Sequence, residues 1–343
     1  MNNLLRTYND LYEDKSKWKY YSKLEGDIPF NSFEAARHFI ERFIQLSGKS
    51  HENSLYENIQ KLDEDRIKHI VSVFFFGTSI YYSVSSIRSS IDRVVSRYQK
   101  QNPASRIEFS FIWFLICLFH DLGYDIEENK KFSDFEDFIS DKVKYFLNKS
   151  VGVPQLYENT YKNYFNYRLK SFCPNIRKPD HGICGGILLF SELNMILLKK
   201  QCNIKTEGLS WNDKLKNIYK FASWVILSHN IFFIRQGDCS ESEYIENNLQ
   251  DLILSKDDKP KVNYKKHSFL YLFMLVDSID PVKIFGDFSI LQHINIETSE
   301  NEIKISIHDR VKREIYFQKV NNLKEWLIPD IIEEGETIRI LIS

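Results

Sequence analysis

The sequence predicts a mainly α-helical protein with a small α+β lobe at its C-terminal end. Through residues 62–285, apolar residues recur at spacings of three and four, the period of an α-helix that packs on one side. From residue 288 onward the spacing changes to two, which is the period of a β-strand. Only 12 Gly and 8 Pro interrupt 343 residues that are 43% hydrophobic, so the chain can build a large core.

The composition excludes several classes of protein. A hydrophobic fraction of 43% with a formal net charge of −1 is unlike a disordered chain, and it disfavours a protein that binds nucleic acid mainly through charge. The five cysteines form no CxxC pair, so we expect neither a disulfide framework nor a cysteine zinc site. No signal peptide is visible at the N-terminus, which favours a cytoplasmic protein.

Three segments are expected along the chain. Residues 1–61 predict an N-terminal helical extension with a helix near Phe33–Leu46, residues 62–285 a helical domain, and residues 286–343 the α+β lobe. The most apolar run, residues 109–119, is shorter than the roughly 20 residues that span a membrane, so we expect a buried helix there.

The C-terminal lobe is predicted from alternating residues and turn signals. Asp280-Pro281 should end the helical domain, because a proline disfavours helix at the residue before it. Alternation over residues 290–296 and 303–307 predicts a hairpin, followed by a short helix near residues 322–327 and a strand over residues 337–342. Before the lobe, the long polar run 236–266 is expected to be a surface loop or lid.

Ionisable residues interrupt the apolar faces of three predicted helices. His69 shares a face with Val73 and Phe76, and helical spacing carries two further apolar series onto His229 and Asp277. An unpaired buried charge is costly, so such groups must be paired, hydrogen-bonded or bound to a metal ion. A single histidine on an apolar face is more often a core residue, and the hypothesis of a site depends on the whole set.

The apolar helix 109–119 ends in the pair His120-Asp121. A polar pair at the end of a fully buried helix is a candidate for a pocket. Adjacent helical residues point about 100° apart, so the two side chains could hold one ion together, or Asp121 could bridge two ions. We interpret Gly182, Gly185 and Gly186 as points of close helix packing, and Cys184 beside them as a small buried side chain.

The candidate residues follow the order His, His-Asp, His, His, Asp, each on its own predicted helix. They are His69, His120-Asp121, His181, His229 and Asp277. With the segments FLICLFHDLGY, PDHGICGGILL, VILSHN and MLVDSIDP, this order resembles the HD superfamily of metal-dependent phosphohydrolases. The resemblance covers roughly residues 62–285 and implies an HD-domain-like helical bundle that holds metal ions between its helices.

The resemblance also implies a metal centre with two divalent ions. It assigns one ion to His69, His120, Asp121 and Asp277, and a second ion to His181, His229 and a bridging Asp121. Imidazole and carboxylate ligands suit Mn, Fe, Co, Ni or Zn, and the sequence does not choose among them. In this reading His120 and Asp121 are the catalytic residues, and a metal-bridging hydroxide attacks phosphorus.

A small anionic substrate follows from the same resemblance. The expected activity is that of a phosphohydrolase or phosphodiesterase on a nucleotide-like phosphoester, with nucleic acid less favoured and no membrane partner. Tyr124 stands where many family members have lysine, so an acid role for that lysine is not carried over. The candidates for substrate contact are Tyr124, Asn230, Arg168, Arg177, Lys178 and Arg235.

Two other functions stay open at this point. Some relatives use the same ligand order for a mixed-valent di-iron site that activates oxygen, which iron content, a visible absorption band and oxygen consumption would reveal. The helices could also form a non-catalytic module that binds a nucleotide and regulates the C-terminal lobe. Nucleotide binding without turnover would favour that module.

Overall fold

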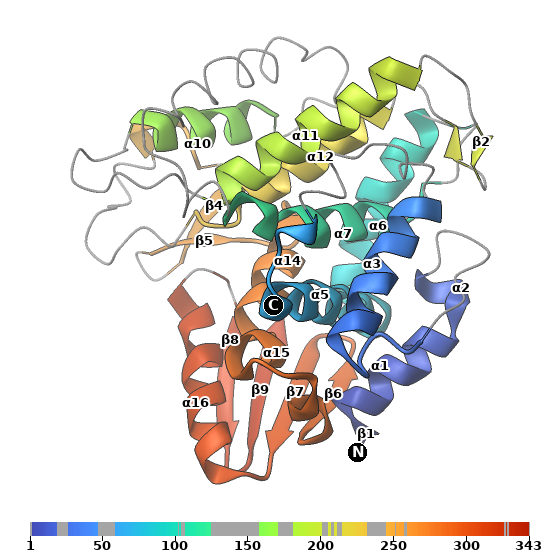
Figure 1. The fold of residues 1–343 in the computed structure, drawn as a ribbon. Helices are drawn as coiled ribbons and strands as arrows, with labels where there is room; N and C mark the ends of the chain where they lie inside the picture. Colours follow the sequence, from blue (N-terminus) through green and yellow to red (C-terminus); the bar gives the residue numbers. More distant parts are fainter. Residues whose placement is uncertain are drawn as a thin grey trace.

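The structure is a computed structural model, in which most described residues are helical and a small antiparallel sheet lies at one end (Figure 1). It describes residues 2–18, 27–46, 59–101, 103, 107–124, 158–170, 181–200, 205–206, 209–210, 215–231, 245–250, 252–256, 259–325, 327 and 329–342. The arrangement agrees with the predicted helical protein carrying a small C-terminal lobe.

The long helices of the central part bring distant segments of the chain together. They are α3 (Phe33–Leu46), α5 (Glu64–Ser83), α6 (Ser85–Gln101), α7 (Phe109–Phe119), α10 (Glu158–Lys170), α11 (His181–Lys200), α12 (Leu215–Ser228) and α14 (Ser268–Ile279). α7 contacts α5, α11, α12 and α14, so it lies at the centre of this group. Every residue of α7 is buried, as predicted from its composition.

The helix α5 shows how local sequence fixes the start of a central helix. The side chain of Asp63 accepts a hydrogen bond from the backbone N–H of Arg66 at 2.9 Å, and Glu64 and Asp65 occupy the first turn. A capping carboxylate and acidic residues at this end complement the helix dipole. Every residue from Ile67 to Tyr81 is buried, so the helix runs through the core.

The sheet combines the C-terminal lobe with the first residues of the chain. Its strands are β1 (Asn2–Asn3), β6 (Ile294–Ser299), β7 (Glu302–Ile307), β8 (Pro329–Glu334) and β9 (Thr337–Ile342), in the order β1-β6-β7-β9-β8 and all antiparallel. The helix α16 (Arg310–Asn321) packs between β7 and α14. Through α16 and α14 the lobe therefore contacts the helical part directly.

Several predictions for the lobe are confirmed, and others need correction. The hairpin β6–β7 and the final strand β9 form as expected, and Asp280 separates α14 from the short helix α15 (Pro281–Phe285). The hairpin begins only at Ile294, because the side chain of Asp287 accepts from the N–H of Ser289 and starts a 3-10 helix, η2 (Phe288–Gln292). The helix α16 and the strands β8 and β1 were not predicted from the sequence.

The polar run 236–266 is only partly a loop. Within it, β4 (Ile253–Lys256) and β5 (Lys259–Val262) pair as an antiparallel hairpin, while residues 236–244 lie outside the described residues. A second short hairpin joins β2 (Lys205–Thr206) to β3 (Leu209–Ser210). Hydrogen bonds between neighbouring strands thus organise segments whose composition alone predicts no strand.

The N-terminal residues pack against both parts of the molecule. The helix α1 (Leu4–Glu13) follows β1 and contacts α5 and η2, and α2 (Lys15–Trp18) contacts α5 and α7. The side chain of Trp18 is fully buried and packs against Phe39 of α3 and Phe75 of α5. The segment 2–18 therefore contributes buried side chains to the common core.

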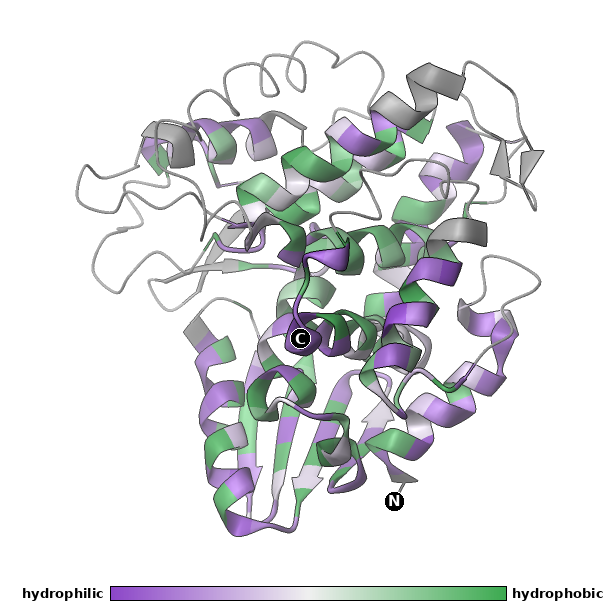
Figure 2. Cartoon of the chain, viewed as in Figure 1, coloured by the Kyte–Doolittle hydropathy of each residue, from purple (hydrophilic) through white to green (hydrophobic). Residues whose placement is uncertain are grey.

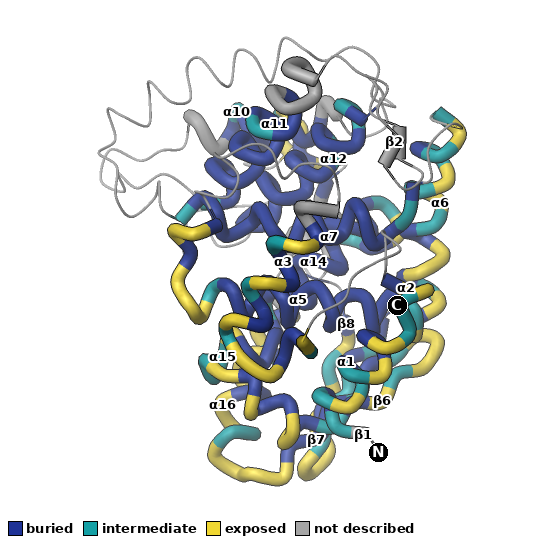
Figure 3. The backbone as a smooth tube through the Cα atoms, turned by 45° about the vertical axis from the view of Figure 1, so that its right-hand side comes forward, coloured by how far each residue is buried: buried dark blue, intermediate teal, exposed yellow. Residues whose placement is uncertain are grey.

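Hydrophobic side chains concentrate where the central helices meet. Figure 2 shows hydrophobic residues along α7 and the neighbouring parts of α5 and α14, and Figure 3 shows the same helices as buried. Among the described residues, no single helix combines the length and the apolarity of a membrane span. The consecutive helices α5 and α6, bent by 102°, reach both limits only when taken together.

Candidate metal centre

Three elements carry the predicted ligands into one buried place. His69 projects from α5, His120 and Asp121 follow the end of α7, and Asp277 lies in the last turns of α14. α7 ends at Phe119, and a short 3-10 helix, η1 (Asp121–Gly123), continues the chain, with His120 between them in the right-handed helical conformation (φ −63°, ψ −37°). Adjacent residues of a helix point about 100° apart, so His120 and Asp121 can both reach the same place.

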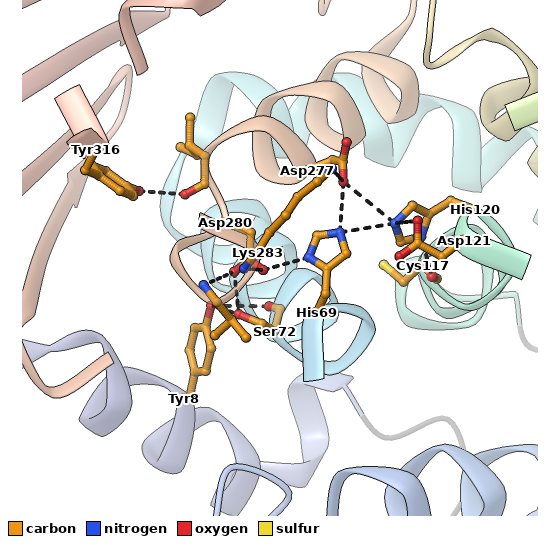
Figure 4. A network of polar contacts seen from close by, with 12 residues as sticks. Tyr8, His69, Ser72, Cys117, His120, Asp121, Asp277, Asp280, Lys283 and Tyr316 are labelled. Atoms are coloured by element: carbon orange, nitrogen blue, oxygen red, sulfur yellow. Dashed lines mark hydrogen bonds and ion pairs between the residues drawn. The ribbon is translucent and has the colours of Figure 1, made fainter. Parts of the chain in front are cut away.

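The distances among these side chains fit a shared cation. Nε2 of His69 lies 3.2 Å from Nε2 of His120 and 2.9 Å from Oδ1 of Asp277 (Figure 4). Nε2 of His120 lies 3.2 Å from Oδ1 of Asp121. His69, His120 and Asp121 each offer a ligand atom, and these three atoms lie within 4.8 Å of one another. All four side chains are at most 5% exposed.

The other ring nitrogens decide which atom of each histidine can act as a ligand. Nδ1 of His69 lies 2.7 Å from a carboxylate oxygen of Asp280, and Nδ1 of His120 lies 2.6 Å from the carbonyl oxygen of Cys117. Nδ1 of His229 lies 2.5 Å from the carbonyl oxygen of Ile226. Because these oxygens can only accept, each Nδ1 carries the hydrogen, and in the neutral ring Nε2 keeps a lone pair for a cation.

The donor atoms of this arrangement suit a metal ion. Two Nε2 lone pairs facing each other at 3.2 Å repel unless a proton or a metal ion lies between them. The nearby oxygens of Asp121 and Asp277 add negative charge at the same point. Imidazole nitrogen together with carboxylate oxygen is a ligand set for divalent transition metals.

The histidines differ in whether a metal ion would have to displace a proton from Nε2. Burial lowers the pKa of His69, but hydrogen bonds to Asp277 and Asp280 outweigh it and raise the pKa to about 9. Burial lowers the pKa of His120 and of His229 to about 4, despite neighbouring carboxylates. In neutral solution His69 is therefore charged without a metal ion, and the other two rings are neutral.

The two carboxylates are ionised. Burial opposes this, but His120, His69 and Lys283 together hold the pKa of Asp121 below its usual value. The pKa of Asp277 lies well below its usual value, because Lys283 and the hydrogen bond from His69 overcome burial. Both groups therefore offer negative oxygen to a cation over the whole physiological pH range.

Asp280 is a site residue that the sequence analysis did not single out. Its fully buried carboxylate accepts from Nδ1 of His69 and from Oγ of Ser72 at 2.5 Å, and it caps α15 through the N–H of Lys283 at 3.0 Å. Tyr8 of α1 donates in turn to the carbonyl oxygen of Ser72 at 3.2 Å. Asp280 thus orients the His69 ring from behind, and the sequence signal was its position three residues after Asp277.

Replacing Asp280 with Asn should weaken metal binding without unfolding the protein. The amide keeps the shape of the side chain but loses the negative charge that holds the His69 ring. Outer-shell partners of this kind change metal affinity by about 10- to 100-fold, and we expect a loss in that range by calorimetric titration with Mn²⁺. Ser72→Ala is the control, because it removes a neighbouring hydrogen bond and leaves the contact between Asp280 and His69. Equal losses in both variants would contradict the orienting role.

His181 and His229 continue the site as a row of imidazole rings. The ring centroids of His120 and His229 are 6.1 Å apart, and those of His229 and His181 are 5.1 Å apart. His229 is buried just after α12, and His181 is the partly buried first residue of α11. Within the described chain, the compact ligand group is His69, His120 and Asp121, and the two remaining histidines lie beside it.

Tyr124 and Asn230 both contact His181. The Tyr124 ring stacks on the His181 ring with centroids 3.8 Å apart, and the guanidinium of Arg66 lies 3.8 Å from the centre of the Tyr124 ring. The Asn230 amide donates to Nε2 of His181 at 3.3 Å. Because a guanidinium and an imidazole both stack on Tyr124, this residue fixes the orientation of the His181 ring but supplies no positive charge.

Glycine brings His181 close to His120. A Cβ atom on Gly123 would lie 1.9 Å from the carbonyl oxygen of His181, and one on Gly185 would lie 2.4 Å from that of Phe119. Backbones this close exclude any larger residue at either position. Gly185 and Gly186 therefore serve helix packing, as predicted, and Cys184 is fully buried beside them.

Replacing Gly123 with Ala should displace the start of α11. The new methyl group meets backbone atoms, which cannot rotate away, so we expect a loss of about 1–3 kcal/mol in the free energy of unfolding. Urea unfolding followed by circular dichroism measures this loss. Gly335→Ala, in the distant β8–β9 turn, is the comparison variant. Gly335 has a φ of 61° and nothing lies within 4 Å of the added atom, so this substitution introduces backbone strain without a steric contact. An unchanged midpoint for Gly123→Ala would contradict the close approach.

The remaining candidates for substrate contact lie outside the described side chains. Arg177, Lys178 and Arg235 lie outside the described residues, and of Arg168 only the backbone, in α10, belongs to them. One cation that the sequence pattern did not indicate, Lys283, does reach the centre. Nζ of Lys283, from α15, lies 2.7 Å from Oδ1 of Asp277.

Comparison of this chain with models of protein families, with curated proteins and with solved structures finds no match. A function for the protein therefore has to be inferred from the chemistry of the centre itself.

Proposed function

We propose that this protein is a metal-dependent phosphohydrolase of the HD type, acting on a small nucleotide-like phosphoester. The observation that carries the proposal is the convergence of His69, His120 and Asp121, next to Asp277, with both imidazole Nε2 atoms turned inward. The sequence order of these residues resembles that family, and the geometry supports a cation at the place where the resemblance expects one.

The residues divide into those that would hold ions and those that orient them. His69, His120, Asp121 and Asp277 would hold one divalent ion. We assign His181 and His229, whose ring centroids are 5.1 Å apart, to a second ion that would share Asp121. Ions of this class supply Lewis acidity and lower the pKa of water, which is the chemistry that phosphoester hydrolysis needs. Asp280 and the carbonyl oxygens of Cys117 and Ile226 fix the ring orientations.

An apolar wall on one side and two ionised carboxylates surround the proposed ligands. Phe273 packs against the rings of His120 and His229, with centroids 5.0 and 5.2 Å away. This apolar wall and the buried helix α7 keep bulk water away from one side of the ligands. Asp121 and Asp277 stay ionised there, so a substrate phosphate has to meet positive charge at the centre to be bound.

The proposal is tested by metal content and turnover. Purified protein should retain or take up a divalent transition metal, and the Mn²⁺- or Co²⁺-loaded form should hydrolyse members of a panel of phosphomonoesters, phosphodiesters and nucleotides. Chelation should abolish this turnover, and added metal should restore it. Iron with a visible absorption band and oxygen consumption would favour the oxygenase instead. Nucleotide binding without any turnover would favour the regulatory module.

A further inference from the structure

Lys283 contributes a partly exposed side chain to the candidate metal centre. Its side chain is 42% exposed, whereas those of Asp277 and Asp121 are each 5% exposed. Figure 4 shows this side chain running past Asp280 toward the carboxylate of Asp277. The side chain is therefore exposed along part of its length, while its ammonium contacts a buried carboxylate of the centre, so Lys283 connects the solvent with the ligands.

The backbone around α15 fixes the starting point of this side chain. Asp280 accepts from the N–H groups of Val282 and Lys283 at 3.4 and 3.0 Å, and Pro281 occupies the first turn of the helix. The same aspartate orients His69. One carboxylate thus couples the position of the ammonium to the position of a metal ligand.

The ammonium of Lys283 has donors left for a ligand. It carries three N–H groups, and among the residues that the structure describes its hydrogen-bond acceptor is Oδ1 of Asp277. Lys68 of α5 differs, because its side chain is 9% exposed and its ammonium contacts both Glu64 and Asp287. Lys68 therefore neutralises local carboxylates, while Lys283 can also turn toward an incoming anion.

Position 124 supplies no positive side chain to bind a phosphate group at this centre. Tyr124 lies between Arg66 and His181 and carries no charge. Asp121, Asp277 and Asp280 add three carboxylates, which repel a phosphate dianion. A lysine ammonium is a compact positive charge that binds phosphate oxygen well.

We propose that Lys283 binds the phosphoryl group of the substrate, with its ammonium donating to a non-bridging phosphate oxygen beside Asp277. The inference rests on the proposed phosphohydrolase function and names the residue that recognises the anionic group. Inorganic phosphate, the smallest species with the same group, should therefore bind to the metal-loaded protein through Lys283.

The test measures phosphate binding and metal content separately. Lys283→Met, Lys283→Arg and the control Lys319→Met, an exposed residue of α16, are loaded with Mn²⁺ and titrated with inorganic phosphate by calorimetry. We expect the phosphate Kd of Lys283→Met to rise about 10- to 100-fold, as for loss of one charge-assisted hydrogen bond. Lys283→Arg should recover part of the affinity. Lys319→Met, with the same change of net charge, should match the unaltered protein.

The outcomes distinguish this inference from the proposed function. A metal-loaded Lys283→Met protein with an unchanged phosphate Kd overturns the inference and leaves the phosphohydrolase proposal intact. A loss of Mn²⁺ from Lys283→Met also overturns it, because Lys283 would then act through Asp277. An unaltered protein that takes up no metal overturns the proposed function and, with it, the role given to Lys283.

Discussion

Asp121→Ala should remove the bound metal and abolish hydrolysis while leaving the helical fold in place. Asp121 lies beside the Nε2 atom of His120 and is the residue that two ions would share. Changes in outer-shell partners already cost about 10- to 100-fold, so loss of a ligand should lower kcat/KM by at least about 100-fold. Elemental analysis and turnover on the most active substrate of the panel measure the two effects.

Asp10→Ala is the matched control for this prediction. It removes one carboxylate from α1, where Asp10 is exposed and, within the described part of the chain, its side chain forms a surface ion pair with Arg6. Surface ion pairs of this kind contribute little to stability, so the control should keep its metal, its turnover and its helical circular dichroism. Unchanged metal content in Asp121→Ala would contradict the assignment of the metal centre.

Metal affinity should rise steeply with pH between about 7 and 9. The pKa of His69 is raised to about 9, so below that pH an ion binding at Nε2 must displace one proton. The apparent Kd for Mn²⁺ should therefore fall about tenfold for each pH unit up to pH 9 and level off above it. His120 and His229 have pKa values of about 4 and release no further proton in this range.

Calorimetry in buffers of different ionisation enthalpy counts the displaced protons. We expect the ion that binds at His69 to release close to one proton at pH 7 and none above pH 10. The stability of the metal-free protein should fall with pH, in the opposite direction to the metal affinity. Because the pKa of His69 is higher in the folded than in the unfolded chain, its contribution to stability is complete below about pH 6.5 and is lost as the pH rises through 9. A metal affinity that is flat from pH 7 to 9 would show that His69 is not a ligand.

The sequence predicted the helical core from its periodicity, but it did not predict every element. Residues 109–119 are apolar throughout, and a helix there can only be buried. The helix α16 has mixed polar and apolar residues, and three residues from its sequence, Tyr316, Phe317 and Val320, are buried only because α14 and the sheet cover them. The strand β1 has two asparagines, and its pairing with β6 depends on a segment almost 300 residues away.

The ligand residues were identified by a conflict within the sequence. His69, His229 and Asp277 lie at helical spacing among large apolar residues, where an ionisable group is costly unless something pairs with it. The structure buries all three side chains and brings two of them to one point. Spacing along one helix shows which face a residue occupies, and so the burial could be predicted before the contacts were known.

The sequence by itself determined which ionisable side chains lie on the buried faces of helices, because local period and composition fix the inward face of each helix. Only the tertiary structure decided the geometry around them: that Asp280 holds the His69 ring, that Lys283 reaches Asp277, and that Gly123 admits α11 close to α7. These relations join separate elements across the core. They depend on how helices pack in three dimensions, and no spacing within one segment encodes them.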